Sequence, residues 1–313
     1  MVTTMRRLHF WGFIAGGLLL VPGFNSAAGA RQSLQEKQII VTVINTKTGN
    51  PVTGVTAPAL VIKEDGTERE IVKVEPATSP MAVVLLADTT ATFRNNLKEL
   101  RDAAAGFITA FTAKNAGSSV ALWKFGGAVL PVTQFVTDAG ALNSEAAKLR
   151  PQDAVLEDAT GRAASRTADE AASVLLDAVV EGSKALAKRS ETRKVVVSFN
   201  KITAEEKSRA QKPQVVSELQ KSGAAWFGVT LADGGTASSM RDSLMAEVTR
   251  TSGGLRLTIQ EAVRLEAAMK AIADIVSTQY VVTYKRASGS AKEVAIEVKG
   301  EGLGAFYSRW APK

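Results

Sequence analysis

The chain from Met81 to Ser277 alternates short apolar runs with longer amphipathic patterns, and this alternation constrains the fold more than any other feature. Short apolar runs bounded by turn residues predict buried strands, whereas apolar residues that recur every three or four positions predict helices. Strands that alternate with helices form a mostly parallel sheet with helices on both faces. The predicted strands are Met81–Ala87, Ser119–Phe125, Val129–Val136, Lys194–Phe199, Ala225–Leu231 and Leu255–Leu257. The predicted helices are Phe93–Lys114, Ala139–Leu149, Thr167–Lys188, Glu205–Ser222, Ser238–Thr251 and Ile259–Ser277.

Two local features refine this prediction. The short gap at Gly126–Ala128 predicts that one neighbouring strand pair is an antiparallel hairpin at an edge of the sheet. Pro213 is expected to start or kink the helix predicted at Glu205–Ser222, because proline has no backbone N–H to donate.

The segments on either side of this region have strand character instead. The predicted strands are Ile39–Ile44, Ala59–Ile62 and Glu70–Val74 before it, and Gln279–Tyr284, Glu293–Val298 and Ala305–Tyr307 after it. Three short strands bury too little apolar area to form a stable domain alone. We therefore expect residues 31–79 and 278–313 to pack together as a small β-sandwich beside an α/β domain at residues 80–277.

The strand predicted at Met81–Ala87 ends in a small polar cluster. Asp88 follows the apolar run directly, and hydroxyl groups follow at Thr90 and Thr92. Open α/β sheets bind ligands at the carboxyl ends of such strands, and one carboxylate with two neutral oxygens suits a hard divalent cation. The alternative interpretation is that these residues end the strand and cap the next helix.

The first thirty residues have the pattern of a secretory signal peptide. Arg6 and Arg7 precede an apolar core from Phe10 to Val21, and small residues end at Ala30, the expected cleavage site. The apolar core is short for a transmembrane helix, so membrane attachment is expected only if this segment stays uncleaved. We therefore expect a secreted or periplasmic protein.

Histidine and cysteine are absent after the predicted signal peptide. The only histidine is His9, and there is no cysteine. This excludes serine–histidine and cysteine–histidine nucleophiles and zinc sites built from imidazole or thiolate. The formal net charge is +7, but charges of both signs are interspersed and form no basic block of the kind that binds nucleic acid. Carboxylate, hydroxyl and lysine chemistry remains, together with oxygen-ligated divalent cations.

A set of short motifs occurs in a characteristic order along the chain. The motifs are Gly49–Gly54, Glu64–Gly66, Asp88–Thr92, Ser173–Ala178, Arg193–Val197, Ser252–Gly254 and Gln279–Tyr284. Together they resemble the von Willebrand factor type A domain of secreted bacterial proteins, over nearly all of the chain after the predicted signal peptide. The resemblance implies a doubly wound, mostly parallel six-stranded sheet at residues 80–277. It also implies a role in adhesion or complex assembly rather than in catalysis.

The family resemblance further implies a metal-ion-dependent adhesion site, and this chain departs from its pattern. In the family, Asp-x-Ser-x-Ser, a threonine from a second loop and an aspartate from a third loop hold Mg²⁺, and a partner protein usually supplies a further carboxylate. Thr90 and Thr92 stand where the family has the serines, and Ser173 stands where it has the threonine, so each hydroxyl is kept. Lys201, or Asn200 in a register shifted by one, stands at the aspartate position.

The missing carboxylate predicts a degenerate site with weak or absent binding of Mg²⁺ or another divalent cation. Two interpretations of Lys201 are open: its ammonium takes part of the metal's electrostatic role beside Asp88, or it points into solvent. Asp233 is a further candidate for the missing carboxylate. The candidate metal-site residues are Asp88, Thr90, Thr92 and Ser173, and the candidate partner contacts are Asp88, Thr90, Ser173 and Lys201.

Three functions remain open from the sequence. The first is an exported binding module that contacts another envelope or extracellular protein through the loops near Asp88, Ser173 and Lys201, which the fold supports only by analogy. The second is a purely architectural envelope protein without metal. The third is a hydrolase that uses Asp88 with Lys201, or the residues of an acidic loop. That loop contains Asp153, Glu157 and Asp158.

Overall fold

The computed structural model describes residues 34–151, 156–157, 163–164, 173–202, 206–234, 239–286 and 289–312. The signal peptide expected at residues 1–30 lies outside the described residues. Within the described residues, no helix has the length and apolar character needed to cross a membrane.

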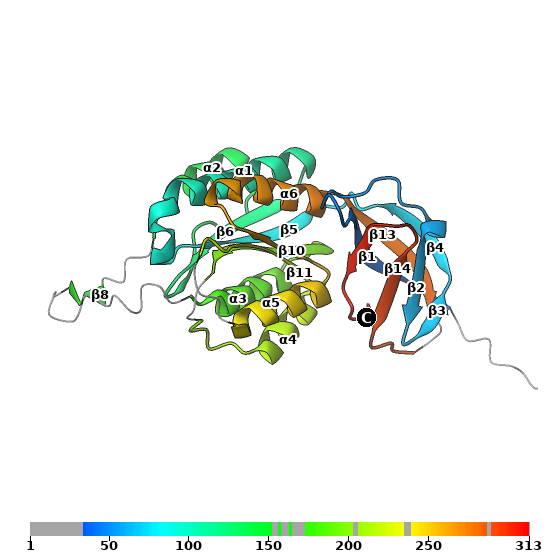
Figure 1. Cartoon of the computed structure of the whole chain (residues 1–313). Helices are drawn as coiled ribbons and strands as arrows, with labels where there is room; N and C mark the ends of the chain where they lie inside the picture. The colour runs from blue at the N-terminus through cyan, green and yellow to red at the C-terminus, as the bar shows by residue number, and fades with distance from the viewer. Residues whose placement is uncertain are drawn as a thin grey trace, which may run out of the picture. The chain divides into compact units, whose positions relative to one another are not determined.

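A six-stranded sheet with the order β12-β11-β10-β5-β6-β7 forms the centre of the α/β region (Figure 1). Its strands are β5 (Met81–Asp88), β6 (Ser119–Phe125), β7 (Val129–Pro131), β10 (Arg193–Lys201), β11 (Ala225–Leu231) and β12 (Arg256–Ile259). Strand β7 pairs antiparallel with β6 at one edge, and all other neighbouring pairs are parallel. The doubly wound fold and the hairpin at the sheet edge are thus confirmed.

Helices cover both faces of this sheet because successive strand residues point to opposite sides. Val83 and Leu85 of β5 lie in one core with α1, α2 and α6, and Val84 and Leu86 lie in a second core with α3, α4 and α5. Figure 1 shows the two sets of helices on opposite faces. The helices are α1 (Leu97–Lys114), α2 (Ala139–Ala146), α3 (Leu175–Ala187), α4 (Lys212–Ser222), α5 (Ser239–Ser252) and α6 (Leu265–Ser277), with short 3₁₀ helices η1 (Ala57–Ala59), η2 (Ala91–Asn96) and η3 (Ala262–Arg264).

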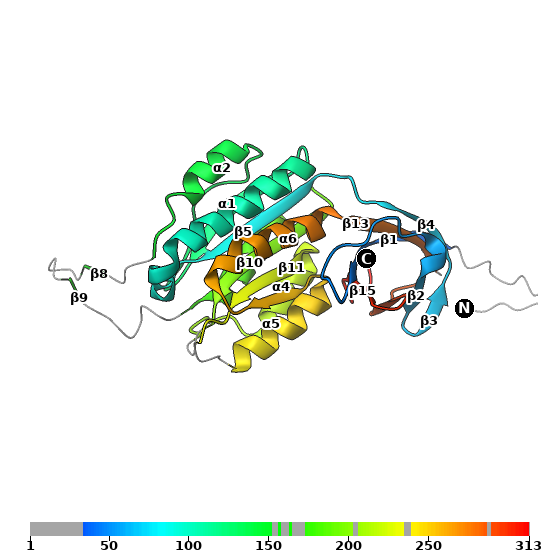
Figure 2. The same ribbon diagram turned by 45° about the horizontal axis from the view of Figure 1, so that its top comes forward.

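Two smaller antiparallel sheets combine strands from both ends of the described chain. One has the order β15-β1-β13-β4 and the other the order β14-β2-β3, and residues of both sheets, including Val41, Ile62 and Tyr284, share one core. The predicted β-sandwich is therefore confirmed, and Figure 2 shows the C-terminus beside β1 and β15. The strands are β1 (Gln35–Asn45), β2 (Leu60–Glu64), β3 (Thr67–Arg69), β4 (Ile71–Pro76), β13 (Gln279–Arg286), β14 (Val294–Val298) and β15 (Leu303–Tyr307), and a separate pair is formed by β8 (Leu156–Glu157) and β9 (Ala163–Ala164).

Prolines lie near two element boundaries. The strand predicted at Val129–Val136 is shorter in the structure: β7 ends at Pro131, and just beyond it the backbone N–H of Leu122 bonds to the Thr133 hydroxyl instead of continuing the ladder. Val136 returns to the sheet only as an isolated bridge with Val120. Helix α4 begins at Lys212 with Pro213 in its first turn, which confirms the helix start expected at that proline.

Candidate functional site

The order of the strands reverses between β5 and β10. Strands β6 and β7 continue on one side of β5, whereas β10, β11 and β12 extend on the other side. In open α/β sheets, such a reversal leaves a crevice beyond the carboxyl ends of the two strands, where ligands bind. Asp88 is the last residue of β5 and Lys201 is the last residue of β10, so the parallel pairing of these strands brings both residues to this edge.

The Asp88 carboxylate connects the ends of these two strands. Its side chain is buried, with 1% of the residue exposed. Oδ1 accepts a hydrogen bond from the backbone N–H of Thr90 at 2.9 Å, and Oδ2 accepts one from the backbone N–H of Lys201 at 3.0 Å. Helix η2 follows Thr90 without a side-chain cap. Asp88 therefore ends the strand, as one interpretation of the sequence held, but it does not cap the next helix.

Burial raises the pKa of the Asp88 carboxyl above its ordinary value of 3.8. The N–H groups of Thr90 and Lys201 and the charge of Arg241 act in the opposite direction, because each favours the ionised carboxylate. The hydrogen-bond donors and the positive charge of Arg241 thus compensate only part of the cost of burying the Asp88 carboxylate.

The two threonines of the first motif bond to each other. The hydroxyl oxygens of Thr90 and Thr92 lie 2.6 Å apart, which is a hydrogen-bond distance. Thr90 is buried, whereas Thr92 lies closer to the surface. The backbone carbonyl of Thr92 accepts a hydrogen bond from the Lys201 ammonium at 3.3 Å. The threonine loop, residues 89–92, is therefore held by a hydrogen bond between its own hydroxyls and is linked to β10 through the backbone carbonyl of Thr92.

The Lys201 side chain lies across the threonine loop. Its ammonium also donates to Asn96 Oδ1 at 3.3 Å and forms an ion pair with Asp233 Oδ2 at 2.7 Å. The side chain is 17% exposed, so the interpretation that it simply points into solvent is wrong. Among the described residues, the ammonium forms no ion pair with Asp88, which bonds to the backbone N–H of Lys201 instead. Asp233, the candidate for the missing carboxylate, is the partner of Lys201.

Ser173 and Asn200 are buried near the ends of α3 and β10. The Ser173 hydroxyl has no hydrogen-bond partner among the described residues, and the Ser173 backbone pairs with the segment that contains Glu206 and Lys207. Asn200 donates to Thr230 Oγ1 at 3.5 Å, while its own side-chain oxygen is unpaired within the described chain. Each of these residues therefore carries a polar atom that the described part of the fold does not satisfy.

Two charged residues that the sequence analysis missed belong to this cluster. Arg241 of α5 is fully buried, and it donates to the backbone carbonyl of Lys201 at 2.9 Å. Its guanidinium also lies 3.5 Å from the carboxylate of Glu206, whose side chain is 2% exposed. Burial raises the pKa of the Glu206 carboxyl, and hydrogen bonding from Ser208 and the charge of Arg241 oppose this shift. Helical spacing was the available signal, since Arg241 precedes the buried residues Leu244, Met245 and Val248 by three, four and seven positions.

The accessible part of the cluster is smaller than the sequence suggested. Asp88, Thr90 and Ser173 have exposed fractions of 1%, 2% and 0%, so a docking protein does not reach their side chains in this conformation. Lys201 is the one predicted partner contact with accessible atoms, and Asp233 lies beside it. The acidic loop residues Asp153 and Asp158 lie outside the described residues, as does the side chain of Glu157.

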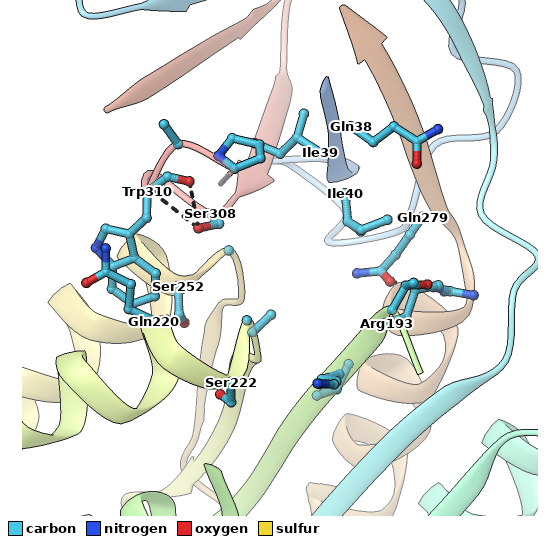
Figure 3. Close-up of a pocket in the computed structure, with 18 of the residues that line it drawn as sticks. Gln38, Ile39, Ile40, Arg193, Gln220, Ser222, Ser252, Gln279, Ser308 and Trp310 are labelled. Carbon is cyan, nitrogen blue, oxygen red and sulfur yellow. Dashed lines mark hydrogen bonds between the residues drawn. The ribbon is translucent and has the colours of Figure 1, made fainter. Parts of the chain in front are cut away.

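A cavity of about 380 Å³ lies at the opposite end of the sheet, where β10 begins (Figure 3). Arg193 and Gln279 lie on one side of it, and Ser252, Ser308 and Trp310 lie on the other. The Arg193 guanidinium donates hydrogen bonds to Gln279 Oε1 and to three backbone carbonyls, those of Ala77, Ser79 and Val276. Burial lowers the pKa of Arg193 to about 10. These contacts give Arg193 a structural role at the junction between the central sheet and the β-sandwich.

Comparisons with known proteins identify the fold. No protein-family model and no curated protein matches the sequence. The structure of a von Willebrand factor type A protein from Catenulispora acidiphila matches with a TM-score of 0.50 and 9% identity, over 83% of this chain and 75% of that chain. Proximal thread matrix protein 1 from the mussel byssus matches with a TM-score of 0.48 and 11% identity, over 65% of this chain and 50% of that chain. The first match shows that the chain has the von Willebrand factor type A fold, as the motifs implied.

Proposed function

We propose that this chain is an exported protein-binding module that contacts its partner at the carboxyl edge of β5, β10 and β11. The observation that carries this proposal is the convergence of three strand ends at the point where the strand order reverses. Thr92 follows β5, Lys201 ends β10 and Asp233 follows β11, and the Lys201 ammonium bonds to both of the other residues. Such an edge is where open α/β sheets hold their ligands.

The proposed contact surface has a charged outer layer over a buried polar cluster. The Lys201–Asp233 pair is partly exposed, at 17% and 23% of the two side chains, and therefore offers one cation and one anion to a partner. Beneath this layer, the Asp88 carboxylate holds the ends of β5 and β10 together through the backbone N–H groups of Thr90 and Lys201. The partner we expect is another envelope or extracellular protein that presents charged side chains to Lys201 and Asp233.

No catalytic role is proposed for the cluster. The Asp88 carboxylate accepts two backbone N–H groups and is buried, and the Lys201 ammonium bonds to the Thr92 carbonyl, Asn96 and Asp233. A carboxylate and a lysine that act as general base and acid need access to a substrate. The arrangement therefore favours recognition over hydrolysis.

Export to the periplasm or the cell exterior is part of the same proposal, and it rests on the signal-peptide pattern of residues 1–30. The test is to express the full chain in a bacterial host and to separate the cytoplasm, the periplasm and the medium. The cell fraction that contains the protein and the protein's N-terminal sequence are then determined. We expect an N-terminus at Arg31 in the exported fraction. Retention of the full-length chain in the cytoplasm would contradict export.

The binding proposal is tested by charge reversal at the contact surface. Envelope extract from the organism that produces the chain is passed over immobilised wild type, Lys201→Glu and Lys212→Glu. Lys212 is the matched control, because it is a lysine on α4 in an exposed ion pair with Glu247 of α5. We expect a protein retained by wild type and by Lys212→Glu to be lost with Lys201→Glu.

One observation favours an architectural role as the second candidate. Asp88 and Thr90 are buried, the Asp88 carboxylate bonds to backbone N–H groups, and the Thr90 hydroxyl bonds to that of Thr92, as in a cluster that only stabilises the fold. In that case, wild type and Lys201→Glu retain the same proteins in equal amounts. This result would contradict the proposed contact surface.

A further inference from the structure

Arg241 places a permanent positive charge inside the candidate site. The residue is fully buried, and its guanidinium bonds to the Lys201 carbonyl and lies 3.5 Å from the Glu206 carboxylate. Its charge also acts on Asp88, where it favours the ionised form of the carboxyl. Arginine stays protonated in proteins, so this cation is present whenever the chain is folded.

The charge of Arg241 offsets a specific electrostatic cost. Asp88 and Glu206 are both buried carboxylates, and an isolated buried carboxylate is strongly unfavourable unless a cation or several donors compensate it. Arg241 interacts with both of them from α5. A single side chain thus compensates two acidic groups that come from different loops.

The oxygen atoms of the first motif do not fit a divalent cation. Mg²⁺ requires near-octahedral oxygen ligands and gives up its waters reluctantly. Both oxygens of Asp88 already accept backbone N–H groups, and the hydroxyls of Thr90 and Thr92 bond to each other. Within the described residues, no group of three acidic, histidine or cysteine side chains is arranged to hold a metal ion.

We infer that the Arg241 guanidinium takes the electrostatic place of the metal ion, so that the site is complete without a divalent cation. The cation in this site is therefore a side chain of α5 and not a bound ion. The Lys201 ammonium, which one of two open interpretations of the sequence placed in this role, instead forms an ion pair with Asp233. This inference concerns the isolated chain and does not depend on whether a partner docks at the edge.

The first test measures the wild-type chain with and without metal. Urea unfolding of the full chain is followed in the presence of a chelator, Mg²⁺ or Mn²⁺, and the same ions are titrated by calorimetry. We expect no change in the unfolding midpoint and no binding heat in the micromolar range. Micromolar binding that Asp88→Ala abolishes, or a midpoint that rises with Mg²⁺, would overturn the inference.

The second test asks whether Arg241 compensates the carboxylates. Arg241→Met removes the charge and keeps an unbranched but shorter side chain, and the unfolding constant is expected to rise by at least about 100-fold, as it does when one partner of a buried ion pair is lost. Adding Glu206→Gln removes one uncompensated carboxylate. The unfolding constant of this double variant is expected to be about tenfold lower than that of Arg241→Met. Lys212→Met is the control, because it breaks an exposed pair with Glu247 and should change little.

The outcomes separate compensation from simple packing. If the double variant is no more stable than Arg241→Met, the guanidinium acts by filling space and the inference fails. It also fails if Arg241→Met is as stable as Lys212→Met. If Arg241→Met does not fold, folding of the double variant supports the inference and its failure to fold contradicts it. Partner capture is not measured in either test, so failure here is distinct from failure of the proposed function.

Discussion

Asp88 and Lys201 are 113 positions apart in the sequence, and the Asp88 carboxylate accepts the backbone N–H of Lys201 at 3.0 Å. The other carboxylate oxygen accepts the backbone N–H of Thr90 at 2.9 Å. One buried side chain therefore fixes the loop after β5 and joins it to the end of β10. Because β5 and β10 flank the reversal of strand order, this contact shapes the candidate site directly.

Asp88→Ala is expected to lower the free energy of unfolding by about 2–4 kcal/mol, measured by urea denaturation. The change leaves two buried N–H groups without their acceptor, and each such loss costs about 1–3 kcal/mol, partly offset because a carboxylate no longer has to be buried. Asp274→Ala is the control: it breaks an exposed pair with Lys114 and should cost less than about 1 kcal/mol. Equal stabilities of the two variants would contradict this role of Asp88.

The cost of Asp88→Asn is expected to depend on pH. Burial raises the pKa of Asp88 in the folded state above 3.8, so the folded chain binds this proton more tightly than the unfolded chain. The stability that Asp88 contributes is therefore largest at acidic pH and decreases as the pH rises through the raised pKa. Since asparagine does not titrate, we expect wild type to exceed Asp88→Asn by more at about pH 4 than at about pH 7. The opposite slope would show that the donors and Arg241 outweigh burial.

The central sheet was predictable because its strands and helices differ clearly in pattern and length. The strand predicted at Met81–Ala87 differs from β5 by one residue, and both packed faces follow from its continuous apolar run. Boundaries set by single hydrogen bonds were harder to predict. The strand expected to reach Val136 ends at Pro131, because the backbone N–H of Leu122 bonds to the Thr133 hydroxyl and the ladder does not continue.

The candidate site was only half predictable. Asp88 and Lys201 stand at strand ends, which the apolar runs mark, so their meeting at one edge follows from parallel pairing. Their actual contact uses the Lys201 backbone, and no sequence pattern distinguishes a backbone donor from a side-chain one. The contribution of Arg241 depends on how α5 packs against the sheet. A charged residue on an apolar helix face indicates burial but does not show which carboxylates it meets.

Glu64→Gln is expected to destabilise the β-sandwich by about 3–5 kcal/mol, as is typical for breaking a buried ion pair. Glu64 of β2 is fully buried and accepts hydrogen bonds from the Arg286 guanidinium and, at 2.5 Å, from the Tyr284 hydroxyl of β13. The pair joins one sheet of the sandwich to the other. Urea denaturation measures the loss, and Glu297→Gln, which breaks an exposed pair with Lys63, is the control.

The pH dependence of Glu64→Gln is expected to run opposite to that of Asp88→Asn. Burial alone raises the pKa of Glu64, but hydrogen bonds from Arg286 and Tyr284 outweigh it and leave the pKa below its ordinary value of 4.5. The stability that Glu64 contributes is therefore complete above pH 4.5 and is lost as the pH falls through the lowered pKa. The difference between wild type and Glu64→Gln should shrink on acidification. A difference that grows there would mean that burial dominates.

Gly254→Ala is expected to destabilise the chain by about 3 kcal/mol or more, because the added methyl group meets backbone atoms that cannot move independently. A Cβ at Gly254 would lie 2.0 Å from the carbonyl oxygen of Trp226, in β11. Relief of this clash requires the connection between α5 and β12 to shift away from the sheet. Gly127→Ala is the matched control, since a Cβ there meets no atom within 4 Å. Similar urea midpoints for the two variants would show that the α5–β12 connection is not held against β11 as closely as the structure indicates.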